Sequence, residues 1–292
     1  MIFLDNLING LSLGSIYAII ALGYTMVYGI ARMLNFAHGD VIMVGAYIAF
    51  CGLQDWGLPP VLAFVVAMVF CTCLGITIEG LAYRPLRHAT SLAVLITAIG
   101  MSYLLQNIAL MIWGANPKSF PTTFINGSSI RLGQLSISTA AIITILANVV
   151  IMVGLTLFTS KTKLGKAMRC VSEDRGAAEL MGINVNRTIS LTFAIGSALA
   201  AVAGILLCSS YPILQPTTGS MPGIKAFTAA VFGGIGSIPG AMLGGILLGV
   251  IEIFGKAYIS TELGDAIVFA VLIIVLLVRP AGLLGKPIRE KV

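Results

Sequence analysis

Long apolar runs separated by short polar segments constrain the fold of this chain more than any other feature of its sequence. Of its 292 residues, 58% are hydrophobic and only 10% are charged, and the mean hydropathy is +1.02. Soluble domains carry about 25% charged residues, so this chain has too few charges to cover a water-exposed surface. In lipid, every backbone polar group must be paired within the chain, which favours membrane-spanning helices. We therefore expect an all-α polytopic integral membrane protein with lipid as its surroundings.

The apolar runs set the expected number of membrane segments. A helix needs about 20 apolar residues, and at least about 17, to cross the hydrocarbon core. Val41–Leu53 and Ala226–Gly236 are shorter and are expected to be half-helices, re-entrant segments or tilted helices. We expect eight or nine membrane segments in a single transmembrane domain, residues 1–292. The remaining runs are Leu7–Ile30, Val61–Tyr83, Leu92–Trp113, Ser138–Thr159, Thr188–Tyr211, Ala241–Ala257 and Ala266–Val278.

Basic residues are concentrated in three polar segments. They follow the run that ends at Tyr83, fill residues 160–187, and follow the last run from Arg279 onward. Because Lys and Arg are enriched in the cytoplasmic loops of membrane proteins, we expect these segments inside the cell and the N-terminus outside. This placement explains the net charge of +6 without nucleic acid as a partner. No Lys or Arg precedes Arg32, so the N-terminus lacks the basic region of a cleaved signal.

Motifs for catalysis or nucleotide binding are not evident in the sequence. A phosphate-binding loop needs Gly-Lys followed by Ser or Thr, whereas the three Gly-Lys pairs here are followed by Ala or Pro. The five cysteines include a Cys71-x-Cys73 pair, whose spacing fits neither a zinc site nor a redox site. We expect free cysteines and no enzyme activity, metal or cofactor in the chain itself.

One polar segment, RCVSEDRGAAELMGINVNRT (Arg169–Thr188), separates two apolar runs. Ser172 is a good N-cap, and the acidic residues after it suit the positive end of a helix dipole. Gly182 is suited to the left-handed residue that commonly follows a helix end. The segment therefore predicts a cytoplasmic helix, Ser172–Met181.

Small residues at the centre of this predicted helix bear on its role. Gly176, Ala177 and Ala178 would let a groove of another protein approach the helix backbone, and the flanking charges could fix the register. The alternative is an amphipathic helix that lies on the membrane surface. The residues alone leave both interpretations open.

Long blocks of sequence resemble one family. SEDRGAAELMGINVNRTISLTF resembles the cytoplasmic coupling loop of ABC importer permeases, and more narrowly that of LivH-type branched-chain amino acid permeases. Three further blocks follow the family in the same order, so the resemblance covers essentially the whole chain. They are GSIYAIIALGYTMVYGIARMLNFAHGD (Gly14–Asp40), KAFTAAVFGGIGSIPGAMLGG (Lys225–Gly245) and RPAGLLGKP (Arg279–Pro287).

The resemblance implies a permease subunit of an importer in the bacterial inner membrane. Such a subunit pairs with a second, homologous permease and with two cytoplasmic ATPase subunits, which bind ATP and Mg. An extracytoplasmic binding protein delivers leucine, isoleucine or valine, which the permeases translocate by alternating access. By position, the residues that match the ATPase-docking motif are Glu173, Asp174, Ala177, Ala178 and Gly182.

Two breaks in the apolar pattern are candidates for the pathway or its gate. NFAHGD places Asn35, His38 and Asp40 after the first span, and FGGIGSIPG places Gly233 and Gly234 in a possible re-entrant loop. His38 and Asp40 could also hold a metal, but no second pair of ligands accompanies them. A structural turn satisfied by hydrogen bonds is the interpretation of NFAHGD that we favour.

Charged residues within membrane spans usually mark function, and here they separate candidate transport mechanisms. Glu79 lies near Arg84 and is interpreted as an interfacial anchor, while Glu252 and Lys256 can pair four residues apart on one helix. No run shows an unpaired central carboxylate, which a proton-coupled carrier needs. This disfavours the alternative function, an ion-coupled secondary transporter of small organic solutes. A channel would leave the docking-type segment without a role.

Glycines recur four residues apart in GAMLGGILLG. Gly240 precedes Gly244 by four positions, and Gly245 precedes Gly249 by four. Small residues at this spacing let helix backbones approach closely in lipid. We expect tight packing within the bundle, with a subunit interface or pore wall as the alternative.

Overall fold

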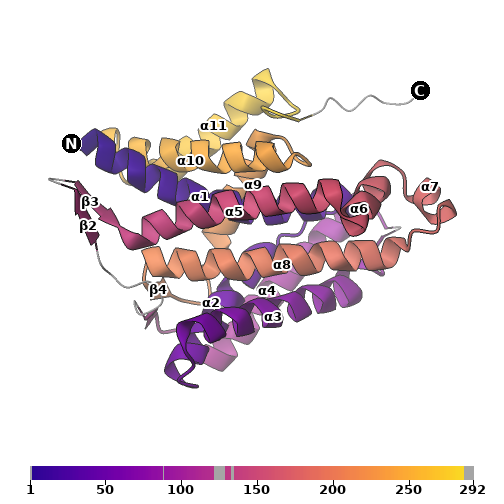
Figure 1. Cartoon of the computed structure of the whole chain (residues 1–292), viewed down its shortest axis with the longest axis horizontal. Coiled ribbons are helices and arrows are strands. Elements are labelled where there is room, and N and C mark those ends of the chain that lie inside the picture. The colour runs from indigo at the N-terminus through magenta and orange to yellow at the C-terminus, as the bar shows by residue number, and fades with distance from the viewer. Residues whose placement is uncertain (1, 88, 122–128, 133–134, 286–292) are drawn as a thin grey trace.

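Long helices that run side by side form the body of the molecule (Figure 1). The computed structural model describes residues 2–87, 89–121, 129–132 and 135–285. In that part of the chain, six helical segments are long and apolar enough to cross a membrane. They are α1 (Ile2–Ala31), α3 (Pro60–Ile78) with its π-helical end η1 (Glu79–Tyr83), α4 (Ser91–Trp113), α5 (Thr139–Lys161), α8 (Val185–Ser210) and α10 (Ile238–Tyr258). The expectation of a mostly helical, polytopic membrane protein is confirmed.

Three shorter helices fall on the remaining predicted runs. α2 (His38–Gln54) has 17 residues, α9 (Ser220–Gly233) has 14, and α11 (Gly264–Val278) has 15. α9 ends before the predicted run does, because Gly234 and Gly236 adopt left-handed φ values of 102° and 93°. The basic residues Lys286, Arg289 and Lys291, predicted to mark a cytoplasmic C-terminus, lie outside the described residues.

Four short strands depart from the all-α expectation. β1 (Lys118–Ser119) pairs antiparallel with β4 (Ile213–Leu214), and β2 (Ser129–Leu132) pairs antiparallel with β3 (Leu135–Ser138). These strands belong to loops, where backbone N–H and C=O groups need partners that no helix supplies. Strands β2 and β3 lie at the same end of the molecule as the N-terminus (Figure 1). The membrane segments themselves are helical, as expected.

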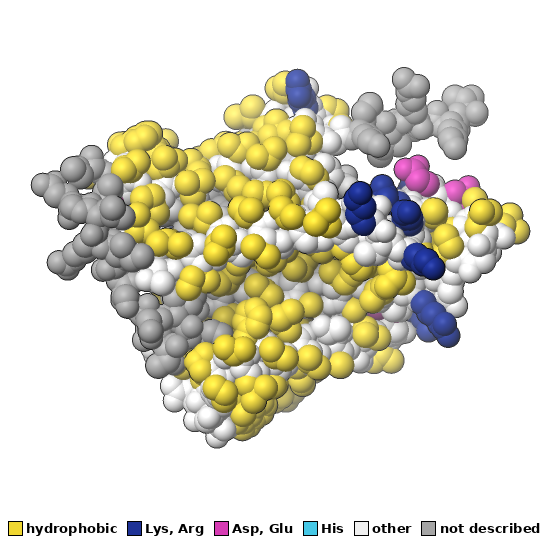
Figure 2. Space-filling view, viewed as in Figure 1, with side chains coloured by type: hydrophobic (Ala, Val, Ile, Leu, Met, Phe, Trp, Pro, Cys, Tyr) yellow, Lys and Arg dark blue, Asp and Glu magenta, His cyan; other side chains and the backbone are white. Residues whose placement is uncertain are grey.

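The spans divide into central and peripheral helices. In the most apolar stretches of α1 and α8, 89% and 83% of the residues are buried, whereas in those of α4 and α5 only 17% are. Large apolar side chains are therefore exposed along α4 and α5, among them Met111 and Val150. Figure 2 shows apolar side chains covering most of one face of the body. Such a surface is suited to contact with lipid or with another apolar subunit.

Glycines bring α10 against two neighbouring helices. A Cβ atom built on Gly245 or Gly249 would meet Ala18 or Gly14 of α1, and one built on Gly240 or Gly244 would meet Gly233 of α9. The two glycine pairs therefore face different helices of the same chain. Tight packing within the bundle, which the sequence predicted, is confirmed.

Candidate functional site

The segment 160–187 folds into two helices rather than one. α6 (Lys163–Glu173) is capped by Thr162, whose Oγ1 accepts a hydrogen bond from the Gly165 N–H at 3.0 Å. α7 (Arg175–Leu180) is capped by Asp174, whose Oδ1 accepts from the Ala177 N–H at 3.0 Å. The predicted single helix Ser172–Met181 is therefore wrong in its start.

The break between the two helices has a local cause. Asp174 is extended, with φ −151° and ψ 116°, so the helix cannot continue through it. Ser172, the predicted N-cap, lies in the last turn of α6, where its hydroxyl donates to the Arg169 carbonyl at 2.7 Å. Ser172 and Asp174 are both good N-cap residues, and the sequence does not show which of the two caps the helix.

The end of α7 agrees with the prediction. Gly182 has φ +81°, the left-handed conformation that glycine adopts without steric cost. Its N–H donates to the Glu179 carbonyl at 2.9 Å, and the next N–H, of Ile183, donates to the Ala178 carbonyl at 3.0 Å. These bonds turn the chain from α7 toward α8.

Exposure divides the predicted docking residues into two groups. Glu173, Asp174, Ala177 and Gly182 are exposed, whereas Ala178 is only 2% exposed and packs inside the chain. A bulky residue at Ala178 would therefore disturb the fold of this segment itself. The apolar side chains offered to solvent are instead Leu180 and Met181, which are 91% and 82% exposed. Sequence reasoning missed this pair, although apolar residues directly before a helix-ending glycine were the available signal.

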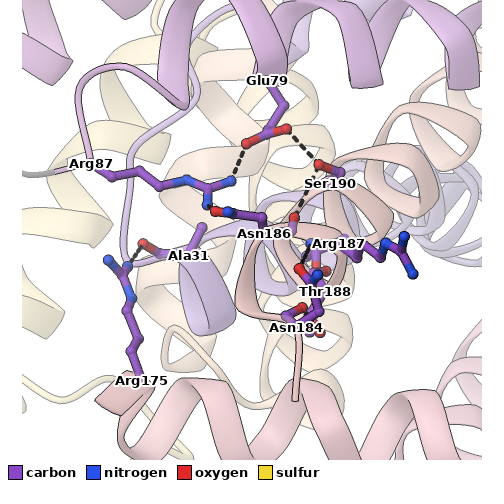
Figure 3. Close-up of polar contacts among 10 residues, drawn as sticks. Ala31, Glu79, Arg87, Arg175, Asn184, Asn186, Arg187, Thr188 and Ser190 are labelled. Carbon is purple, nitrogen blue, oxygen red and sulfur yellow. Dashed lines mark hydrogen bonds and ion pairs between the residues drawn. The ribbon is translucent and has the colours of Figure 1, made fainter. Parts of the chain in front are cut away.

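α7 projects beyond the spanning helices, at the end of the molecule opposite the N-terminus (Figure 1). Figure 2 shows Lys and Arg side chains gathered at the same end. Two hydrogen bonds attach this segment to the end of α1. Arg32 donates to the Ser172 carbonyl at 2.8 Å, and Arg175 donates to the Ala31 carbonyl (Figure 3). The projecting helix is thus fixed to a central spanning helix.

A buried acid anchors the neighbouring spans. Glu79, at the start of η1, pairs with Arg87 and also accepts from the Ser190 hydroxyl of α8 at 2.6 Å (Figure 3). Arg87 donates in addition to Asn186 Oδ1. Arg84, the arginine nearer to Glu79 in the sequence, is exposed, because the chain turns after η1 and brings Arg87 back to Glu79.

The NFAHGD side chains bond to different helices rather than to one another. Asn35 Oδ1 accepts from the Tyr83 hydroxyl at 2.9 Å, and Asp40 Oδ1 accepts from Gln106 of α4 at 2.9 Å. The ring of His38 lies 4.6 Å from that of Tyr24. Main-chain bonds close the turn, since the His38 N–H donates to the Asn35 carbonyl at 3.1 Å. The stretch forms a turn, as the sequence favoured, although His38 Nε2 is buried without a hydrogen-bond partner among the described residues.

Asp40 changes one conclusion drawn from the sequence. It is 2% exposed, and within the described part of the chain it forms no ion pair. The sequence argument against ion coupling considered the apolar runs alone. It did not consider Asp40, which precedes the run Val41–Leu53 and lies in the first turn of α2.

The predicted gate glycines lie elsewhere. Gly233 and Gly234 form the turn between α9 and α10, where the segment after α11 packs on them. The Leu283 N–H donates to the Phe232 carbonyl at 2.9 Å, and the Leu284 N–H donates to the Gly233 carbonyl at 3.0 Å. These bonds, like the NFAHGD bonds, join parts of the chain that are distant in sequence.

A second charged cluster surrounds Glu252 of α10. Its Oε1 is 2.5 Å from Lys256 Nζ, which confirms the predicted pair, and 2.8 Å from Lys225 Nζ of α9. Lys225 also pairs with Asp265 of α11 at 2.6 Å, and the Tyr17 hydroxyl of α1 donates to Glu252 Oε2 at 2.9 Å. These three residues come from other helices, and no pattern in the sequence indicates that they join the cluster.

Comparison with known proteins identifies relatives over the full length. Residues 6–276 match the family described as "Branched-chain amino acid transport system / permease component". The chain is 49% identical to the high-affinity branched-chain amino acid transport system permease protein BraD of Pseudomonas aeruginosa. It is 48% identical to the corresponding protein LivH of Escherichia coli strain K12. Each alignment covers 99% of this chain and 98% of the relative.

A solved structure has a similar fold at low sequence identity. PsaBC from Streptococcus pneumoniae, in complex with a Fab, aligns over 96% of this chain and 93% of that chain, with 16% identity and a TM-score of 0.50. At this identity the likeness concerns the fold alone. The family match and the two relatives establish the assignment: the chain belongs to the family of permease components of branched-chain amino acid transport systems.

Proposed function

We propose that this chain is the membrane-spanning subunit of an ATP-binding cassette importer for leucine, isoleucine and valine. BraD and LivH, at 49% and 48% identity, are both described as high-affinity branched-chain amino acid permeases. Leu180 and Met181 carry the mechanistic part of the proposal, because their exposure on a projecting helix is suited to docking in a partner's apolar groove. The partner that fits is a cytoplasmic ATPase subunit, which would bind the ATP and Mg.

The five residues that match the docking motif would then have two different roles. Asp174 caps α7, Ala178 packs it against the chain, and Gly182 ends it. Glu173 and Ala177 are exposed and would face the ATPase together with the apolar pair. Shaping and contacting are thus separate tasks within one short motif.

The bonds between α7 and α1 provide a route for the movement. An ATPase that closes would displace α7, and through Arg175 and Arg32 the displacement would reach Ala31 at the end of α1. Because α1 is central to the bundle, rigid-body movement there can repack the helices around it. This is the alternating-access movement expected of an importer.

The proposed orientation has nine membrane segments, formed by the six long helices and α2, α9 and α11. The N-terminus would lie outside the inner membrane, and α6, α7 and the C-terminus inside. The binding protein would contact the end that carries β2 and β3, and a second permease the apolar surface of the bundle. Asn35, His38 and Asp40 are the proposed pathway or gate residues near the break between α1 and α2, with Gly233 and Gly234 as a hinge at the α9–α10 turn.

Uptake by reconstituted vesicles tests the proposed function. Vesicles containing both permeases, the ATPases and the binding protein should accumulate radiolabelled leucine when ATP is supplied, and a protonophore should not reduce the initial rate. The chain alone, given a proton or sodium gradient, should accumulate none. Gradient-driven uptake by the chain alone would instead identify a secondary transporter, with Asp40 as the obvious titratable group.

A further inference from the structure

A cavity of about 610 Å³ lies beside the projecting segment, away from the exposed apolar pair. Its lining comes from three parts of the chain: the end of α1, the segment between η1 and α4, and the junction of α6 with α7. Each part contributes one arginine, namely Arg32, Arg87 and Arg175. Three guanidinium groups from separate segments therefore converge on one opening.

Two of these charges are not neutralised within the described part of the chain. Arg32 and Arg175 donate to main-chain carbonyl oxygens, and neither forms an ion pair there. Burial, together with the nearby positive charges of Arg87 and Arg32, lowers the pKa of Arg175. Each guanidinium carries five N–H donors, so donors remain for a ligand.

Arg87 supplies an independent sign of a missing ligand. Its side chain is 8% exposed, and two of its nitrogens bind Glu79 and Asn186. Its third nitrogen, Nε, is buried without a hydrogen-bond partner among the described residues. A buried unsatisfied donor is costly, and this one belongs to a side chain that lines the cavity (Figure 3).

The acidic side chains around the cavity do not account for these donors. Glu79 is used by Arg87 and Ser190. Glu173 and Asp174 also line the cavity, but within the described part of the chain neither forms an ion pair with its arginines, and Asp174 Oδ1 accepts the capping bond from Ala177. The cavity thus keeps an excess of unoccupied donors.

We propose that this cavity binds a phosphate group, held by Arg32, Arg87 and Arg175. A phosphate group offers two non-bridging oxygens in a diester headgroup and four oxygens in the free anion, each with more than one lone pair, and arginine binds both through charge-assisted hydrogen bonds. The phosphate belongs either to the headgroup of an anionic lipid or to free inorganic phosphate. Since the three arginines lie on separate segments, the bound group would tie α7 to the end of α1 and to the segment before α4.

Binding to the purified chain tests this site with two probes. The protein is placed in nanodiscs of phosphatidylcholine, and retention of added phosphatidylglycerol is measured by native mass spectrometry. Binding of inorganic phosphate is measured separately by calorimetry. Phosphatidylglycerol retention without phosphate binding identifies a lipid headgroup site, and binding of inorganic phosphate identifies a site for the free anion.

Three variants locate the binding. Two variants remove charge-assisted bonds to the ligand: Arg32→Gln alone, and Arg32→Gln combined with Arg175→Gln. Each should weaken binding of the probe that the wild-type chain binds by at least about tenfold. Arg169→Gln is the matched control: Arg169 is exposed on α6, outside the cavity lining, and also donates to a main-chain carbonyl, that of Ser160 at 3.2 Å. The exposed single variant at Arg32 covers the case in which the double variant does not fold. Failure of the wild-type chain to bind either probe overturns the proposal, and so does an equal loss in Arg169→Gln.

Discussion

Glu252 is 1% exposed and holds two lysines and a tyrosine at its carboxylate. With Asp265 the cluster contains two acids and two lysines, so its formal charges cancel. Only the pair of Glu252 with Lys256 was predictable, because these two residues are four positions apart on one helix. Lys225 and Asp265 lie on other helices, and nothing in the local sequence indicates which helices will be neighbours.

Glu252→Gln tests the energetic role of this cluster. The substitution keeps the shape of the side chain but leaves the two lysines with one acid, and breaking a buried pair costs about 3–5 kcal/mol. We expect a clear drop in the thermal unfolding midpoint in detergent, partly recovered by adding Lys225→Met, because one lysine and one acid of the cluster then remain. Glu262→Gln, at an exposed position, should unfold like wild type. Equal midpoints for all three variants would mean that the ion pairs add no stability.

At the scale of elements, α1 and α10 are held at backbone contact by glycines. A Cβ atom on Gly14 would lie 2.6 Å from the Ile246 carbonyl oxygen and 2.7 Å from its Cα. The small-residue spacing in α10 predicted close packing, and the match succeeded because spacing is a local property. The spacing alone could not show that one glycine pair contacts α1 and that the other pair contacts α9. Similarly, the sequence predicted that Gly182 would follow the end of α7, but not that Asp174 would be its N-cap.

Gly14→Ala should destabilise the protein. The added methyl group must push two backbones apart, and overpacking of this kind costs about 1–3 kcal/mol. Gly154→Ala is the matched control, because it lies within α5 and a Cβ there meets no atom within 4 Å. That change should stabilise the helix by about 0.5–1 kcal/mol. Thermal unfolding of both variants decides the matter, and equal effects would exclude a packing role for Gly14.

At the scale of the whole molecule, each apolar run of the sequence falls on a helix, because the requirement to pair backbone groups in lipid leaves few other folds. The path between the helices was less predictable. Asn35, in the stretch before α2, and Asp40, in the first turn of α2, are both buried, although the sequence marks this region only as a polar break. Orientation stays a prediction from the distribution of basic residues.

The exposed thiol of Cys170 on α6 tests that orientation. A membrane-impermeant maleimide should label it in inside-out vesicles and not in intact spheroplasts. Cys73 is exposed as well, but it lies in α3 on the apolar surface, where the reactive thiolate is disfavoured. Cys170→Ser should therefore abolish the signal. Labelling of Cys170 in intact spheroplasts would reverse the proposed topology.

Docking of α7 on an ATPase is the central claim, and one measurement tests it most directly. The variant Leu180→Asp with Met181→Asp is co-expressed with the second permease and the ATPases, and the recovered complex is quantified together with ATP-driven leucine uptake. Each buried apolar side chain contributes about 1.5–3 kcal/mol, so ATPase binding should weaken at least tenfold and uptake should fall with it, while pairing with the second permease persists. The control variant is Ile259→Asp, at a 69% exposed apolar position just after the C-terminal end of α10. It should leave ATPase binding unchanged. Wild-type ATPase binding and uptake in the Leu180 and Met181 variant would contradict the account.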